Sequence, residues 1–239
     1  MIVELTGITG TGKSTVLEEL TEFFRLKEID VLDGYDRFLS RFGFRFRNKI
    51  LRTAAVELLL VPAMAISALR KIRYTVFCFR KIAVSSNPVG LKIAILRNTL
   101  KQQALLSVLQ LFDSTDKLTI LDEGTLHNAH NLFIGTPQNA ESREIKKFVQ
   151  LVDLPPVAVV ISAPDDLIVM RSMTRNDPPR KNMSKQDWIN LISKGKAVYT
   201  ALLENEEIRK RVIQYENIGD SGIEEPGKAI LNIIKQQQN

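Results

Sequence analysis

Cysteine and histidine are scarce in this sequence. Cys78 is the only cysteine among the 239 residues, so no disulfide can form within the chain. The two histidines, His127 and His130, have no cysteine near them, which argues against a zinc site. The first residues contain no basic segment followed by an apolar run and a small-residue cleavage site. A reducing cytoplasm is therefore the expected compartment.

Long apolar runs are also missing. The most apolar stretch extends from Leu58 to Leu69 and contains Pro62, and it is shorter than the roughly 20 residues that a membrane-spanning helix needs. The sequence therefore predicts no transmembrane helix. With 44% hydrophobic and 25% charged residues, the composition is that of an ordinary globular protein. We expect residues 1–239 to form a single domain with insertions.

Acidic residues are almost absent from one long segment. Between Arg41 and Lys101 there are 13 lysines and arginines but only one acid, Glu57. This segment carries +12, so the net charge of +6 leaves −6 for the remainder, and a local basic surface is predicted. One interpretation is a helical segment whose cationic side faces water, and the other is peripheral contact of residues 41–101 with an anionic membrane. No nucleic-acid-binding module is recognisable, so no nucleic acid partner is expected.

The spacing of apolar residues indicates an α/β fold. Short apolar segments typical of strands lie at 1–6, 28–32, 118–121, 157–161 and 212–215. A mostly helical insertion is predicted at about 38–112, with breaks at Pro62 and at 85–90. Ser184 and Asp187 match a capping box that opens a later helix. Strands alternating with helices predict the three-layer fold of P-loop NTPases, with a five-stranded parallel sheet between two helical layers.

A phosphate-binding motif follows the first predicted strand. The segment GITGTGKS, residues 7–14, fulfils G-x-x-x-x-G-K-[ST] between a strand and a helix. Backbone N–H groups of such a loop point at phosphate oxygens, and the positive end of the next helix supports them. Lys13 is predicted to reach the β- and γ-phosphates and Ser14 to bind Mg²⁺, so ATP and Mg²⁺ are the expected cofactors. The predicted nucleotide-binding residues are Gly7, Thr9, Gly10, Thr11, Gly12, Lys13, Ser14 and Thr15.

Three segments together resemble a family of small kinases. GITGTGKST, a strand that ends at Asp122, and VAVVISAPDDLIVMRSMTRNDPPR are similar to the thymidylate kinases and other nucleoside and nucleotide kinases. In that family, a series of arginines after the fourth strand enters a lid that closes over the phosphates. The resemblance implies that Arg171, Arg175 and Arg180 are catalytic and that residues 171–184 form the lid. Guanidinium groups bind phosphoryl oxygens in a bidentate manner, which suits this role.

The third predicted strand delivers acidic residues to the edge of the sheet where ligands of open α/β folds bind. Asp122 is predicted to hold the metal or to accept the proton of an attacking hydroxyl, and Glu123 is the alternative base. Gly124 would let an acceptor approach the backbone closely. The kinase family has an arginine directly after the strand-end acid. The sequence Asp122-Glu123-Gly124 departs from that pattern and favours a hydroxyl acceptor over a nucleotide.

The sequence predicts a magnesium-dependent kinase that transfers a phosphoryl group from ATP to a small molecule. The acceptor is either a nucleoside monophosphate or the hydroxyl of a sugar-like metabolite. The predicted acceptor-site residues are Asp33, Arg37, Glu123 and His127. Packing on a helix surface is the alternative for His127, and a turn is the alternative for Asp33 and Arg37. The alternative function is a P-loop switch ATPase without a metabolite acceptor. The location is expected to be cytoplasmic, at the membrane surface if the basic segment contacts lipid, and a homodimer stays open.

Overall fold

The computed structural model describes residues 1–112, 117–134, 141–174, 183–219 and 222–238. In this part of the chain, five parallel strands form one sheet in the order β2-β3-β1-β4-β5. The strands are β1 (Ile2–Gly7), β2 (Val31–Asp33), β3 (Leu118–Asp122), β4 (Val157–Ser162) and β5 (Val212–Glu216). The predicted α/β fold with a five-stranded parallel sheet is confirmed.

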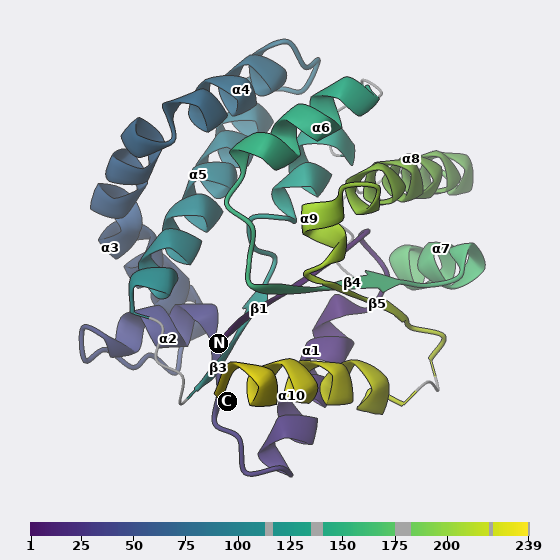
Figure 1. Cartoon of the computed structure of the whole chain (residues 1–239). Helices are drawn as coiled ribbons and strands as arrows, with labels where there is room; N and C mark the ends of the chain where they lie inside the picture. The colour runs from purple at the N-terminus through teal and green to yellow at the C-terminus, as the bar shows by residue number, and fades with distance from the viewer. Residues whose placement is uncertain (113–116, 135–140, 175–182, 220–221, 239) are drawn as a thin grey trace.

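Helices cover both faces of the sheet. Figure 1 shows α1 and α10 on one face and α5, α6 and α8 on the other. The helices are α1 (Lys13–Arg25), α2 (Gly34–Ser40), α3 (Lys49–Arg70), α4 (Ile72–Ala83), α5 (Val89–Leu111), the π-helical η1 (His130–Ile134), α6 (Ser142–Leu151), α7 (Asp165–Thr174), α8 (Lys185–Leu203), α9 (Glu206–Arg209) and α10 (Glu224–Gln238). The predicted break at 85–90 is confirmed, because α4 ends and α5 begins around it.

The alternation of side chains along β1 assigns its residues to the two faces. Val3 and Leu5 belong to the apolar cluster that includes residues of α1 and α10. Ile2 belongs to a different cluster, with residues of α2, α3 and α5. Glu4 and Thr6 lie on the same side as Ile2, and both are fully buried. Two polar groups are thus enclosed under the helices of one face, where they need hydrogen-bond partners.

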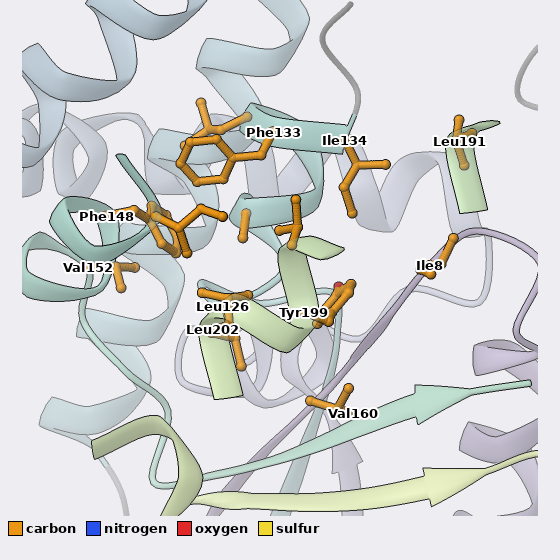
Figure 2. Packing of buried hydrophobic residues seen from close by; sticks show 14 of the residues in the cluster. Ile8, Leu126, Phe133, Ile134, Phe148, Val152, Val160, Leu191, Tyr199 and Leu202 are labelled. Carbon is orange, nitrogen blue, oxygen red and sulfur yellow. The ribbon is translucent and has the colours of Figure 1, made fainter. Parts of the chain in front are cut away.

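The largest apolar cluster lies on this same face, between the sheet and the helices α4, α6 and α8. Figure 2 shows Tyr199 and Leu202 of α8 near Leu126, with Val160 of β4 beneath them and Phe133 farther along. Leu126 and Phe133 belong to the segment that follows β3. Their burial fixes this segment on the sheet, and the segment begins at Glu123.

The sequence predicted a break at Pro62, but the structure has none there. The helix α3 is continuous over 22 residues and contains Pro62. A proline lacks the N–H that would bond the carbonyl four residues earlier, which here is that of Leu58. Both Pro62 and Leu58 lie on the exposed side of α3, so the carbonyl without its usual partner is not enclosed by protein. Among the described helices, α3 is the one long and apolar enough to cross a membrane, judged by length and composition only.

Two further local expectations differ in outcome. The second strand begins later than predicted, at Val31, because Glu28 has a φ of +59° and turns the chain after α1. The capping box at the start of α8 is confirmed: Ser184 Oγ accepts from the Asp187 N–H at 3.1 Å, and Asp187 accepts from the Ser184 N–H at 2.9 Å.

The order of the strands places the P-loop at a switch point of the sheet. After β1, the chain builds β2 and β3 on one side and then β4 and β5 on the other. The crevice beyond the carboxyl ends of strands at such a point is where open α/β folds bind ligands. The loop after β1 and the acidic residues after β3 lie at this edge, because β1 and β3 are parallel neighbours.

Candidate active site

The P-loop is held by hydrogen bonds within the loop and by the segment after β5. Gly12 has a φ of +86°, and a side chain there would overlap Asn217, so only glycine fits. The Thr11 hydroxyl donates to the Ile8 carbonyl at 2.9 Å, and Asn217 Nδ2 donates to the Thr11 carbonyl at 3.0 Å. The hydroxyl of Thr11 therefore supports the loop itself, although the sequence predicted contact with nucleotide. Asn217 was not predicted, because no local motif marks it.

Lys13 lies between the P-loop and the segment after β3. Its side chain is only 10% exposed, and its Nζ is 4.0 Å from Glu123 Oε1. The same Nζ donates to the Gly7 carbonyl at 3.2 Å and to the Ile8 carbonyl at 3.5 Å. The ammonium is thus already directed at the inside of the loop. Oxygens of a bound phosphate would replace these carbonyls as its hydrogen-bond acceptors.

Ser14 and Asp122 line one cavity of about 340 Å³. Ser14 is in the first turn of α1, and Asp122 ends β3. A hydroxyl and a carboxylate are hard oxygen ligands, which Mg²⁺ prefers, and Mg²⁺ commonly takes its other ligands from phosphate and water. In the described ranges, no group of three or more His, Cys, Asp and Glu residues could hold a metal by itself. The pair therefore fits a magnesium ion that arrives with a nucleotide.

Burial and the neighbouring lysines act on the pKa of Asp122 in opposite directions. Its side chain reaches solvent, yet the surrounding protein atoms and the neighbouring Glu123 raise the pKa of its carboxyl above the usual value. Lys13 and Lys49 lower the same pKa. A cation bound between Ser14 and Asp122 would act in the same direction as the two lysines. A cation there would therefore favour the charged form of the Asp122 carboxyl.

Glu123 is held in an unusual backbone conformation. Its φ of +66° lies in the left-handed region, which costs a non-glycine residue about 1–2 kcal/mol. Its N–H donates to the Leu5 carbonyl at 3.2 Å, and its Oε1 lies 3.3 Å from His127 Nε2. Strain of this kind persists where the surrounding structure enforces it, and it concentrates at functional sites.

A buried hydrogen-bonded chain orients Glu123 from behind. Burial, assisted by Lys13, holds the pKa of His127 well below its usual value, so this imidazole is neutral. If His127 Nε2 donates to Glu123, its Nδ1 accepts from the Thr6 hydroxyl at 3.3 Å, and Thr6 is 2.8 Å from the Tyr199 hydroxyl. His127 is 3% exposed and does not line the cavity, which corrects the prediction of substrate contact. It is a positioning residue for Glu123.

Glu4 anchors the backbone that follows Glu123. Its carboxylate, fully buried on β1, accepts from the N–H groups of Leu126 at 3.1 Å and His127 at 2.7 Å. A side chain at Gly124 would overlap this carboxylate. Gly124 therefore leaves room for Glu4, and not for an approaching acceptor as the sequence suggested.

The Glu4 carboxyl should make stability depend on pH. Burial raises its pKa from 4.5 to about 7. The folded protein then keeps a proton that the unfolded chain loses near pH 4.5, so this contribution to stability is lost as the pH rises to about 7. Between pH 5 and pH 8, the free energy of unfolding should fall by about 2–3 kcal/mol from this group. Urea unfolding at both pH values measures the loss, which should be absent in Glu4→Gln. Equal losses in the two proteins would contradict the assignment.

The other walls of the cavity come from β2, α2, α3 and α5. Asp33 and Tyr35 line one side, and Lys49, Arg52 and Thr53 of α3 line another. Arg52 Nη1 lies 3.7 Å from Asp33 Oδ1, and burial raises the pKa of Asp33 despite this cation. Lys49 and Arg52 were not predicted as site residues, because they lie on a helix that no motif connects to the P-loop.

Two predicted acceptor residues on the α2 side have different outcomes. The structure brings Asp33 to the cavity. Arg37 is 8% exposed and does not line it, so its predicted contact with substrate has no support in the geometry.

The predicted lid is described only at its beginning. Arg171 of α7 lies beside the P-loop, with Nη1 at 3.5 Å from the Thr11 carbonyl. Arg175 and Arg180 lie outside the described residues. The structure thus places one of the three predicted arginines next to the predicted phosphate site.

Two other predicted nucleotide-binding residues have different surroundings. Thr9 Oγ1 is 3.4 Å from Nε2 of His130, whose ring stacks on that of His127 at 4.9 Å between centroids. Thr15 is exposed in the first turn of α1. The histidine pair thus contacts the P-loop through Thr9 and the acidic segment through His127, which links the two walls of the site.

Larger hollows lie elsewhere, one of about 820 Å³ between α4 and α6 and one of about 560 Å³ between α6 and α8. Neither is lined by a P-loop residue or by the acids after β3. Size alone therefore does not locate the site. The smaller cavity is the one lined by Ser14 of the P-loop together with Asp122 and Glu123.

Comparison with known proteins adds little to this geometry. No family model and no curated protein matches the sequence. Among solved structures, shikimate kinase from Bacteroides thetaiotaomicron is similar at a TM-score of 0.40 and 12% identity, over 98% of each chain. A likeness at this level carries no argument about activity, so the function is inferred from the site itself.

Proposed function

We propose that this chain is a kinase that transfers the γ-phosphoryl group of ATP to a hydroxyl of a small, sugar-like acceptor. The observation that carries the proposal is the convergence of Ser14, Asp122 and Glu123 on one cavity, with Lys13 at 4.0 Å from Glu123. A phosphate in the P-loop and a hydroxyl in the cavity would then meet in front of Glu123.

Each residue has a distinct task in this proposal. Lys13 binds oxygens of the transferred phosphoryl group, and Ser14 and Asp122 would hold Mg²⁺, which neutralises charge on the phosphates. Glu123 accepts the proton of the acceptor hydroxyl as the oxygen bonds to the γ-phosphorus. The bond from that phosphorus to the β–γ bridging oxygen breaks, and ADP leaves with the electron pair. His127 keeps the Glu123 carboxylate in place through the 3.3 Å contact.

The charges lining the cavity favour a hydroxyl acceptor over a nucleoside monophosphate. Four carboxylates line it, from Glu18, Asp33, Asp122 and Glu123, against the two cations Lys49 and Arg52. Arg52 is already engaged, at 3.0 Å from Asp36 Oδ2. An acceptor phosphate would meet more negative than positive charge, whereas neutral hydroxyls can donate hydrogen bonds to carboxylates.

An acceptor screen tests this proposal. Purified protein with ATP and Mg²⁺ is incubated with pools of sugars and polyols, of nucleosides, and of nucleoside monophosphates, and products are identified by phosphorus NMR. The expected result is one phosphate monoester formed on a hydroxyl compound. Nucleoside diphosphate formed from a monophosphate would overturn the choice of acceptor. Steady ATP hydrolysis that no acceptor accelerates would favour the P-loop switch ATPase instead.

Nucleotide binding should stabilise the fold in a metal-dependent manner. A ligand that binds only the folded state adds RT ln(1 + [L]/Kd), which is about 2.7 kcal/mol at 100 times Kd. Calorimetry should therefore show a higher Tm with ATP and Mg²⁺. Chelation of Mg²⁺ should remove most of the shift, because Ser14 and Asp122 would then face the phosphates without a cation. An unchanged Tm with every nucleoside triphosphate would contradict the P-loop assignment.

A further inference from the structure

The outer face of α3 is apolar along its whole length. Every solvent-exposed residue between positions 50 and 69 is apolar. Leu58 and Leu69, two turns or more apart, are 73% and 75% exposed. We call this set the α3 stripe: Ile50, Leu51, Ala54, Leu58, Val61, Pro62, Ala65, Ile66 and Leu69. Their spacing of three and four residues places them on one side of the helix.

The two charged residues between the ends of α3, Arg52 and Glu57, point inward instead, whereas Lys49 and Arg70 at its ends are exposed. Arg52 Nη1 lies 3.0 Å from Asp36 Oδ2 of α2. Glu57 pairs with two cations of α5, Arg97 at 3.6 Å and Lys101 at 3.5 Å. A surface helix of a water-soluble protein normally has the opposite polarity, with its charges outside. An exposed apolar face of this extent marks a surface that contacts something other than water.

This helix cannot cross a bilayer in the observed fold. On its inner side, Val56 and Leu60 pack in one cluster with Leu105 and Leu106 of α5. Figure 1 shows α3, α4 and α5 packed together beside the sheet. A spanning α3 would draw the ion pairs of Glu57 and the charges of α5 into hydrocarbon, which is costly. The geometry instead suits a helix that lies in the plane of a membrane surface.

Cationic and aromatic residues flank both ends of the α3 stripe. Arg45 and Arg47 precede α3, and Arg70 and Arg73 follow the stripe. Within the described part of the chain, these four arginines make no ion pair. The exposed Phe42 and Phe44 lie close to the first pair in sequence, and the exposed Ile72, Val76 and Phe79 continue the apolar surface onto α4. An apolar strip with cations at its ends is complementary to lipid tails beneath anionic headgroups.

We propose that the α3 stripe docks this protein on an anionic lipid membrane. The apolar side chains enter the boundary between headgroups and acyl chains, and the flanking arginines bind lipid phosphates. Lys49, Arg52 and Thr53 of the same helix line the 340 Å³ cavity, so α3 carries both the docking stripe and part of the cavity wall. Binding by the stripe does not depend on the proposed kinase activity, and its test needs no substrate.

Vesicle flotation with the full chain tests the proposal. Vesicles of phosphatidylcholine alone are compared with vesicles that also contain phosphatidylglycerol, at about 0.1 M and about 1 M salt, where the Debye length falls from about 10 Å to about 3 Å. The protein should float with the anionic vesicles at low salt and much less at high salt. Replacing Arg45, Arg47 and Arg73 by glutamine should lower binding by about fivefold for each cation removed.

Two exposed pairs of residues provide the variant and its control. Leu58→Gln with Leu69→Gln should lower vesicle binding at least about tenfold, because each leucine contributes apolar area that enters the membrane. Leu26→Gln with Ile189→Gln removes exposed apolar side chains elsewhere and should leave binding unchanged. All four positions are on the surface, so Tm and ATP binding should be retained.

Several outcomes would overturn the proposal. Absence of flotation with anionic vesicles at low salt is one, and equal binding by the Leu58/Leu69 variant is another. Sedimentation velocity gives the third: a concentration-dependent dimer that the same variant abolishes would show that the stripe joins two copies of this chain.

Discussion

Lys13→Ala is expected to abolish measurable phosphoryl transfer while the protein remains folded. Lys13 Nζ sits inside the P-loop, at 3.2 Å from the Gly7 carbonyl and 4.0 Å from Glu123 Oε1. Removing one preorganised hydrogen-bond donor to a developing charge commonly lowers the rate by about 10²–10³. Removing a fully charged ammonium that binds the transferred phosphoryl group should lower it at least as much. We expect a loss in kcat/KM of about 10³ or more, measured by ADP release in the presence of the acceptor.

The control for this variant is Lys27→Ala, which removes an exposed lysine just beyond α1. It should retain wild-type kcat and KM. Circular dichroism and Tm should show that Lys13→Ala is folded, because the carbonyls to which Lys13 donates belong to its own loop. Transfer at more than about a tenth of the wild-type rate would contradict the proposal that Lys13 stabilises the transition state.

Glu123→Gln is expected to cause the second large effect. The amide keeps the size of the side chain and cannot accept the acceptor's proton, so kcat should fall by about 10²–10⁴. The affinity for ATP should change much less, because no phosphate contact is removed. Isothermal titration with a non-hydrolysable ATP analogue measures that affinity separately from kcat.

Asp122→Asn discriminates between the two adjacent acids. If Asp122 holds the metal, this variant should require more Mg²⁺ for half-maximal rate, and saturating Mg²⁺ should restore part of the activity. Glu123→Gln should show an unchanged Mg²⁺ requirement at its low kcat. The reverse pattern, with kcat lost in Asp122→Asn at every Mg²⁺ concentration and activity kept in Glu123→Gln, would make Asp122 the base.

The proposed membrane docking and the proposed catalysis both involve residues of α3. The first turn of α3 supplies Lys49 and Arg52 to the cavity, and the α3 stripe begins beside them at Ile50. Burial and Glu123 raise the pKa of Asp122, and Lys49 offsets part of that rise, so the same turn also acts on the predicted metal ligand. Under the two proposals, the surface that contacts lipid and the cavity that binds the acceptor would share this one helix.

Much of the fold and the nucleotide end of the site could be predicted from the sequence, because both depend on neighbouring residues. The P-loop is contiguous, and its function needs only a strand before it and a helix after it. Apolar segments such as 157–161 identify buried strands because their side chains need cover on both faces. The position of Asp122 followed from the end of β3, since parallel strands end at a common edge.

The acceptor end and the support of Glu123 were decided by tertiary structure. Thr6 and Tyr199 are hydrogen-bonded across 193 positions of the chain, and Arg52 reaches Asp33 from a different helix. Asn217 and Glu4 hold loops that lie far from them in sequence. No local pattern marks such residues, because their roles depend on which polar groups the packed sheet and helices bring within about 3 Å.

The exposed and buried sides of α3 show most clearly what the sequence predicted and what only tertiary packing decided. By its sequence, α3 is a helix with apolar residues on all sides, and the number of cations around it predicted a basic surface. Only packing against α5 decides that Val56 and Leu60 are buried, that Glu57 turns inward to its cations, and that the α3 stripe is left outside. A helix with apolar residues on both sides can pack with either side against the protein. The neighbouring helices that bury one side therefore determine which side remains exposed.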